Sequence, residues 1–158
     1  MNSPAPRAGG FGPPYLQARI DREIALARHI GVVVERADEH GLVLSAPLEP
    51  NGNHKGTAFG GSLYSLAVLT GWAWATRYLA VRGIEADPVI QESNIQFLAP
   101  VTGELRAHLA TPGGAEIDKF RKMLERAGRG RIQLRVELRQ GSSVAVRFDG
   151  MFAAAARE

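Results

Sequence analysis

The stretch from Ser62 to Leu79 constrains the fold of this chain more than any other part of the sequence. It contains no proline, and its apolar side chains recur at intervals that cover more than half the circumference of a helix. Between Gly60 and Thr76 there is no Asp, Glu or His. A helix that is apolar nearly all round must be covered by other elements. The sequence therefore predicts a long buried helix, ended by Gly83, at the centre of the molecule.

Segments on both sides of this helix have the patterns of strands and of amphipathic helices. Runs that are rich in β-branched residues, or that alternate between apolar and polar residues, predict strands. Apolar residues at helical spacing predict amphipathic helices. We therefore expect an α+β fold in which one curved antiparallel sheet wraps around the central helix. The expected strands are 31–35, 41–46, 89–98, 104–110, 131–138 and 143–153, and the expected flanking helices are 15–30 and 114–127.

The length of 158 residues fits a single globular domain. Residues 1–14 are rich in Pro and Gly, so we expect a flexible N-terminal arm there and one domain over residues 15–158. The alanine-rich end, residues 153–158, is expected to fray. A six-stranded sheet leaves open edges, and a second subunit is a natural way to cover one of them.

Composition excludes several classes of site. Cysteine is absent, which removes disulfides, thiol nucleophiles and Cys-ligated zinc. The N-terminal segment lacks the apolar core of a signal peptide, and the longest apolar stretch, 63–75, is too short to cross a bilayer. We therefore expect a cytoplasmic protein without membrane association. We predict no cofactor, and no metal site either, because the histidines lack the spacing of metal ligands. They are His29, His40, His54 and His108.

The net charge of +3 gives little support for nucleic-acid binding. Basic residues concentrate between 119 and 131, but acidic residues are interleaved with them and only Phe120 provides an aromatic side chain nearby. A nucleic-acid surface is usually more one-sided and richer in aromatic residues. The pattern is typical of a solvated amphipathic helix followed by a charged strand. A phosphate-bearing small molecule stays open as a ligand.

The segment with the clearest chemical character runs from Asn53 to Leu63, because Gly60 and Gly61 stand where an irregular loop enters the long helix. Without side chains there, a ligand atom can approach the free N–H groups of the first helical turn. Such donors can hold a carbonyl oxygen that becomes negative during acyl transfer. The alternative is that the two glycines only permit a tight turn.

The same segment, NHKGTAFGGSLYSL, resembles the loop-to-helix signature of hotdog-fold thioesterases, in which an Asn, a Gly and then His-Gly-Gly or Phe-Gly-Gly lead into the central helix. IQFLAPVTG, at 95–103, resembles the strand and turn that follow that helix in the same superfamily. The motifs SAPL, LTGW and RFDG narrow the resemblance to the thioesterase-like domain that in some bacterial proteins is fused to an N-acetyltransferase domain. The resemblance covers residues 30–155. It implies the hotdog fold, a thioester substrate, and a homodimer or dimer of dimers in which two sheets join.

One position departs from the pattern of these enzymes. Many of them carry a carboxylate on the central helix, nine residues after the first residue of the His/Phe-Gly-Gly motif, where it acts as base or nucleophile. Counting from Phe59, that position is Val68. A polar residue outside the helix must therefore replace the acid if the protein is an enzyme.

Three polar residues are candidates for this role. Asn53 matches the Asn of the motif and can hydrogen-bond a thioester carbonyl or orient water, or it can form an Asx-turn in the loop. Glu92 lies among apolar strand residues, where burial would suit it to general-base catalysis, although strand alternation puts it on the face opposite Ile95. His54 can activate water or be a solvated loop residue. We expect Asn53 to be the most sensitive site and Glu92 to rank ahead of His54. The residues expected to bind the thioester are Phe59, Gly60, Gly61, Ser62 and Ser65.

The leading interpretation is an enzyme that hydrolyses an acyl thioester carried on coenzyme A or on acyl carrier protein, with backbone N–H groups near Gly60 and Gly61 polarising the carbonyl. The alternative is a non-catalytic module that binds acyl thioesters and has kept the fold but lost the acid. A hotdog dehydratase ranks third, because such enzymes need a His and a carboxylate brought together.

Overall fold

Six strands form one sheet around a long helix, α3, in the computed structural model, which describes residues 8–157 of the chain. The strand order is β1-β2-β4-β5-β6-β3, and every neighbouring pair is antiparallel. The elements are η1 (Ala8–Phe11), α1 (Pro13–Glu23), α2 (Ala25–Ile30), β1 (Val33–Asp38), β2 (Gly41–Ala46), η2 (Glu49–Asn51), α3 (Gly60–Val81), β3 (Ala86–Phe97), β4 (Leu105–Ala110), α4 (Gly114–Ala127), β5 (Arg129–Gln140) and β6 (Ser143–Ala156).

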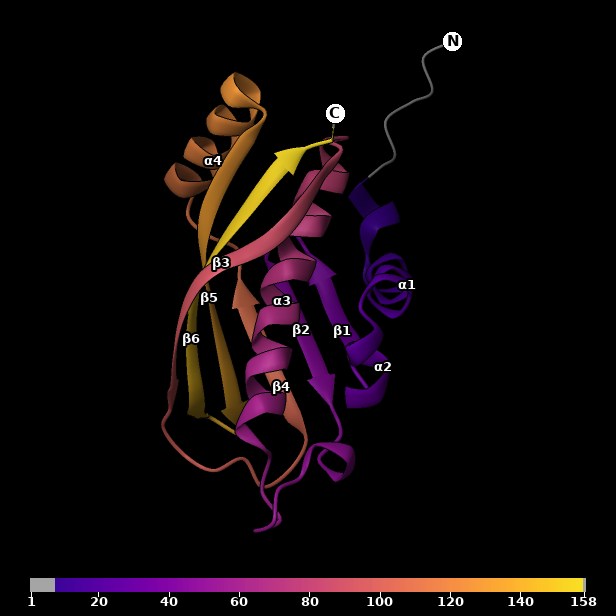
Figure 1. Ribbon diagram of the computed structural model, residues 1–158, viewed down its shortest axis with the longest axis vertical. Coiled ribbons are helices and arrows are strands. Elements are labelled where there is room, and N and C mark those ends of the chain that lie inside the picture. The colour runs from indigo at the N-terminus through magenta and orange to yellow at the C-terminus, as the bar shows by residue number, and fades with distance from the viewer. Residues whose placement is uncertain (1–7, 158) are drawn as a thin grey trace.

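The sheet curves around α3 along most of the length of the helix. Figure 1 shows α3 against one face of the sheet, with α1 and α2 beside β1 and with α4 at the other side, near β5. This arrangement confirms the expected α+β architecture of a curved antiparallel sheet on a central helix. Among the helices of residues 8–157, none is long and apolar enough to span a membrane.

The core lies between α3 and the sheet, and it includes side chains from nearly every side of the helix. Leu63, Leu66 and Ala73 are buried, as the apolar pattern of the segment requires. Gly71 allows the closest approach to the sheet, because a Cβ atom there would overlap the ring of Phe152 on β6. Phe152 is itself buried, so it has little room to move away.

The helix expected over residues 15–30 is two helices. Between α1 and α2, Ile24 has an extended backbone with φ −120° and ψ 91°. The guanidinium of Arg28 donates to the carbonyl oxygen of Asp21, one of the acceptors that the last turn of α1 leaves unpaired. Gly31, with φ +80°, ends α2 as expected.

Most other boundaries agree with the expected ones or lie a few residues away. The structure confirms the strand 41–46 and the helix 114–127. The central helix is longer at both ends than the stretch Ser62–Leu79. Strand β3 also begins earlier, because pairing with β6 extends it back to Ala86, beyond the locally β-rich residues.

Part of the segment expected to be a flexible arm has regular structure. Residues 8–14 contain η1 and the first residues of α1. The side chain of Phe11 is buried, and its carbonyl oxygen accepts a hydrogen bond of 3.1 Å from Nε of Arg77 on α3. Apolar burial and this contact fix a segment whose Pro and Gly content alone predicts flexibility. Residues 1–7 lie outside the described part of the chain.

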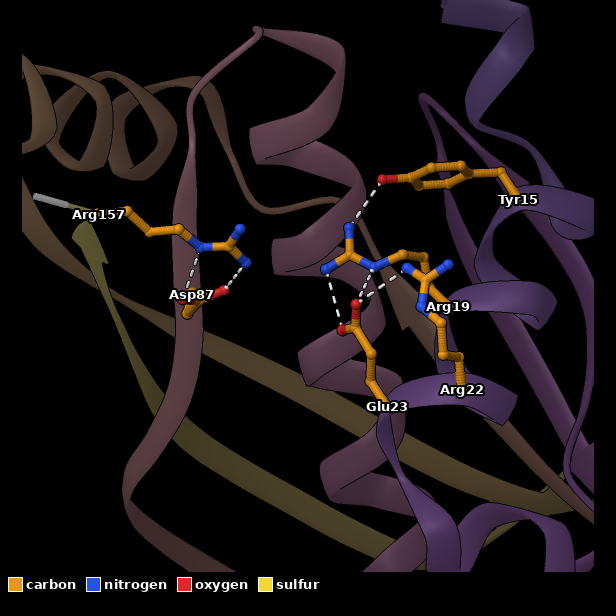
Figure 2. A network of polar contacts seen from close by, with 6 residues as sticks. All are labelled: Tyr15, Arg19, Arg22, Glu23, Asp87 and Arg157. Atoms are coloured by element: carbon orange, nitrogen blue, oxygen red, sulfur yellow. Dashed lines mark hydrogen bonds and ion pairs between the residues drawn. The ribbon is translucent and has the colours of Figure 1, made fainter.

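The alanine-rich end also differs from the expected frayed tail. Ala153–Ala156 belong to β6 and pair with β3 on one side and β5 on the other. Small side chains suit this position, where Ala154 is buried. Beyond the strand, Arg157 forms an ion pair with Asp87 at the start of β3, with a hydrogen bond of 2.9 Å from Nε. Figure 2 shows this pair together with the separate network that Arg19 makes with Tyr15 and Glu23 on α1.

Candidate functional site

The loop that leads into α3 is held by a buried asparagine that the sequence analysis did not single out. Asn51 is 2% exposed. Its side-chain amide donates to the carbonyl oxygens of Ile30 and Pro47, at 2.8 Å and 2.7 Å. Its own carbonyl oxygen accepts a hydrogen bond from the N–H of Phe59 at 2.7 Å. Asn51 therefore fixes the point at which the loop turns into the helix. Its place between Pro50 and Gly52 predicts a turn but not burial.

Asn53 stabilises the loop in the way the Asx-turn alternative describes. Its Oδ1 accepts hydrogen bonds from the N–H groups of Lys55 and Thr57, at 2.8 Å and 3.1 Å. Its Nδ2 donates to Oγ1 of Thr57 at 2.9 Å. These three bonds engage both polar atoms of the side chain within the loop. His54 follows on the same turn and is exposed.

The first turn of α3 offers free N–H groups at two glycines. In residues 8–157, neither Gly60 nor Gly61 donates its N–H to a backbone or side-chain acceptor, and Phe59 caps the helix without a side-chain bond. Neither glycine has a positive φ, so the tight-turn alternative does not account for them. A Cβ atom at Gly60 would lie 3.6 Å from the ring of Phe97, and one at Gly61 would overlap the ring of Phe59. Gly61 thus makes room for the ring of Phe59, and Gly60 leaves the backbone beside Phe97 without a side chain.

An apolar groove of about 450 Å³ begins one helical turn beyond the glycines and runs along the seam between α3 and β3; we call it the α3–β3 groove. Val68, at the position where many hotdog thioesterases carry an acid, lies in its wall. None of its lining residues is Asp, Glu, His, Lys or Arg. The lining residues are Ile24, Leu26, Tyr64, Ser65, Val68, Leu69, Trp72, Pro88, Val89, Ile90 and Phe152.

Two hydroxyl groups meet beside this groove. Oη of Tyr64, on α3, lies 2.5 Å from Oγ of Ser93, on β3. The ring of Tyr64 packs edge-on against Phe148, with centroids 5.8 Å apart. Ser65, which also lines the groove, instead donates its hydroxyl to the carbonyl oxygen of Gly61 at 2.8 Å. Ser62 is half-buried on the first turn of the helix.

Glu92 does not face the groove. It is exposed, and its neighbour Ser93 bonds to α3, so strand alternation directs Glu92 to the opposite face of the sheet. The structure therefore brings Gly60 next to Phe97 of β3 and puts Ser65 in the groove lining, with Gly61 between them on α3. Glu92 and His54 lie on the surface outside the groove lining. In residues 8–157, no three His, Asp or Glu side chains gather where they would hold a metal ion.

The pair Tyr64 and Ser93 escaped the sequence analysis because neither residue belongs to a recognisable catalytic pattern. A signal was present: Tyr64 stands four residues after Gly60 and three after Gly61, which places it on the same side of a helix as both. Its partner on a distant strand could not be read from the sequence.

Comparison with solved structures identifies the fold. A protein of unknown function from Chlorobaculum tepidum is 30% identical, with a TM-score of 0.87 over 94% of this chain and 99% of that one. A "putative thioesterase" from Shewanella oneidensis is 25% identical, with a TM-score of 0.82 over 92% and 97% of the two chains. A protein of Pseudomonas aeruginosa named a probable thioesterase, 21% identical with a TM-score of 0.75 over 92% and 97%, shares the fold. The fold is the hotdog fold of thioesterases.

The family comparison covers almost the whole chain. Residues 14–156 match the model of the family described as "Putative thioesterase (yiiD_Cterm)". This range includes the loop from Asn51, the glycines at the start of α3, and the α3–β3 groove. The chain therefore belongs to the yiiD_Cterm family of thioesterase-type hotdog proteins.

Proposed function

We propose that the protein hydrolyses an acyl thioester carried on coenzyme A or on acyl carrier protein. The observation that carries the proposal is the continuity of the seam between α3 and β3. At one end are the N–H groups of Gly60 and Gly61, which have no acceptor in the described part of the chain, and one helical turn further on the α3–β3 groove begins. A thioester has the matching layout, a polar carbonyl joined to an apolar chain. Family membership and the similar solved structures support the same reaction class.

In the proposed reaction, the oxygen of a water molecule bonds to the carbonyl carbon, and the π electron pair moves onto the carbonyl oxygen. The N–H groups of Gly60 and Gly61 stabilise the charge on that oxygen. When the intermediate collapses, the C–S bond breaks and its electron pair leaves with the sulfur. The proton given up by the water ends on the thiolate, so the products are a carboxylic acid and a thiol.

The residue that takes the proton from water lies outside the groove lining in this proposal, since the lining has no Asp, Glu or His side chain. His54 and Glu92 are the candidates with titratable groups, and Asn53 acts through the shape of the loop. Removing each in turn tests them: His54→Ala, Glu92→Gln and Asn53→Ala, with turnover followed against pH. A wild-type profile from both His54→Ala and Glu92→Gln would exclude both as the base.

A second candidate function is a module that binds acyl thioesters without hydrolysing them. Val68 in the place of an acid, and a groove lining without Asp, Glu or His, favour it. Thiol release from butyryl-, octanoyl- and palmitoyl-coenzyme A, and from the same chains on acyl carrier protein, separates the two. Release above the uncatalysed rate supports the hydrolase. Calorimetric binding without release supports the module.

The proposed assembly is a homodimer, or a dimer of dimers, joined through β3. This strand lies at the edge of the sheet and pairs only with β6 in the described chain. Large apolar side chains on it and just after it are exposed, among them Val89, Phe97 and Leu98. Unpaired strand edges with exposed apolar residues are suited to pairing with another copy. The α3–β3 groove borders this edge, so a partner would also close it.

A further inference from the structure

The hydroxyl pair of Tyr64 and Ser93 is placed at the groove by an irregularity in β3. The pairing of β3 with β6 shifts register between Ile90 and Glu92, the mark of a β-bulge. Before the bulge, Pro88, Val89 and Ile90 line the groove, and of these Pro88 and Ile90 are turned inward while Val89 is exposed. After the bulge, Ser93 bonds to α3 and Phe97 approaches Gly60. Without the extra residue, alternation from Ile90 would turn Glu92 toward the helix. The bulge exchanges a carboxylate for a hydroxyl on this face.

The hydroxyl pair of Tyr64 and Ser93 has one O–H donor more than its mutual hydrogen bond needs. Two hydroxyls carry two protons, and the bond of 2.5 Å between Tyr64 and Ser93 uses one of them. No other hydrogen bond of either side chain occurs in the described residues. One O–H donor therefore stays available. Tyr64 lines the groove and Ser93 does not, so the arrangement that serves a ligand has Ser93 donating to Oη of Tyr64 while Tyr64 directs its own proton into the groove.

We propose that Tyr64 donates a hydrogen bond to the carbonyl oxygen of the bound thioester, and that Ser93 positions the Tyr64 hydroxyl for this contact. The inference rests on the proposed function and names a residue that acts in it. Neutral hydroxyls are donors suited to an oxygen that gains negative charge. The helical spacing puts Tyr64 one turn from Gly60 and Gly61 on the same side of α3, and helical side chains lean toward the N-terminus. The phenol therefore adds a third donor beside the two N–H groups.

The hydroxyl of Tyr64 can be removed without changing the packing of its ring. The ring contacts Phe148 edge-on and keeps that contact when only the oxygen is removed. Tyr64→Phe is therefore the primary variant. Ser93→Ala removes the positioning hydroxyl, and Ser93→Thr keeps it. Tyr78→Phe is the matched control, since Tyr78 lies on the same helix, is buried, and has a hydroxyl without a hydrogen-bond partner in the described residues.

The test measures thiol release from octanoyl-coenzyme A by the full-length protein and by each variant, after circular dichroism has shown that each is folded. We expect Tyr64→Phe to lower kcat about 10- to 100-fold with little change in KM, and Ser93→Ala to lower it about 3- to 10-fold. Ser93→Thr should restore most of the rate, and Tyr78→Phe should match the wild type. The double variant should equal Tyr64→Phe alone, because Ser93 acts through Tyr64.

Wild-type kcat in a folded Tyr64→Phe protein would overturn the inference while leaving the hydrolase proposal intact. Multiplying losses in the double variant would overturn the positioning role of Ser93. If Tyr64→Phe does not fold, Ser93→Ala and Ser93→Thr decide the question by loss and rescue of kcat. If both of these have wild-type kcat, the inference is wrong.

If the wild type releases no thiol, the hydrolase proposal fails and a binding measurement decides the inference. The probe is the ketone analogue of octanoyl-coenzyme A, in which CH₂ replaces the sulfur and the carbonyl carries ¹³C. We expect its carbonyl stretch to move to lower frequency on the wild type, and this shift to shrink on Tyr64→Phe. Equal shifts on both proteins, or no binding to the wild type, would overturn the inference.

Discussion

At the scale of single residues, the start of α3 is built around absent side chains. Gly60 and Gly61 have no positive φ, so the absence of a side chain, rather than the backbone conformation, distinguishes these positions. A Cβ atom at Gly60 would lie 3.6 Å from the ring of Phe97, a normal contact, so the position has room for a methyl group. We therefore expect the effect of a substitution at Gly60 to depend on the size of the new side chain.

The first prediction concerns alanine and valine at Gly60. Gly60→Ala should fold, with unchanged or slightly higher stability, because alanine favours helix and fits against Phe97. Gly60→Val should fold but lose about 100-fold in thioester turnover, because its branches cover the N–H groups proposed to hold the carbonyl oxygen. Initial rates with octanoyl-coenzyme A, with circular dichroism as the check of folding, measure both. A fully active Gly60→Val protein would count against the oxyanion role of this turn.

The second prediction concerns His108, on β4, and the pH dependence of stability. Burial lowers the pKa of His108, and the positive charges of Arg139, Arg106 and Arg36 lower it further, against a small opposing effect of Glu137. The unfolded chain therefore takes up a proton at higher pH than the folded one, near the ordinary value of about 6.5. Stability from this residue is complete above that pH and is lost as the pH falls through it.

The free energy of unfolding in urea should accordingly fall between pH 7.5 and pH 5.5, and it should fall less in His108→Gln, which cannot take up the proton. His29→Gln, which replaces an exposed histidine of α2, is the control and should keep the wild-type dependence. Identical slopes in His108→Gln and the wild type would contradict the assignment.

At the scale of elements, the distance between α3 and the sheet is set by one glycine. A Cβ atom at Gly71 would overlap the buried ring of Phe152. Gly71→Ala should therefore destabilise the fold by about 1–3 kcal/mol, although the same change in an unpacked helix is stabilising. Urea unfolding measures the difference. Phe152→Leu should recover part of the loss in the double variant, and equal effects of Phe152→Leu with and without Gly71→Ala would show that the two positions do not interact.

At the scale of the whole molecule, β3 is the edge through which we expect two copies to join. A lysine at Val89 places a charge at this edge and should shift the mass in solution from at least twice 17.0 kDa toward 17.0 kDa. Val33→Lys is the matched control, because Val33 is similarly exposed on β1, the opposite edge strand. Light scattering at micromolar concentration measures both. A monomeric wild type would refute the dimer, and a dimeric Val89→Lys would place the interface elsewhere.

The sequence by itself determined the central helix, the number of strands and the loop that enters the helix. Apolar periodicity over Ser62–Leu79 allows only a helix that is buried on nearly all sides, and that requirement holds whatever surrounds it. The short β-rich segments are then the elements that must form a sheet to bury this helix. For the same reason, the glycines at the start of α3 could be recognised as an opening before any contact was known.

Only the tertiary structure decided which polar groups stand at that opening. The local sequence does not distinguish the roles of Asn51 and Asn53. In the structure, the side chain of Asn51 is buried and donates to two carbonyl oxygens, whereas that of Asn53 closes an Asx-turn. Alternation counted back from Ile95 already puts Glu92 on the opposite face, whereas alternation counted forward from Ile90 would turn it toward α3. The bulge where β3 pairs with β6 reconciles the two, so that Ser93 faces α3. Alternation in a strand is a local property with a period of two, whereas a bulge is fixed by the partner strand. The groove's hydroxyl pair therefore depends on contacts between segments far apart in the chain.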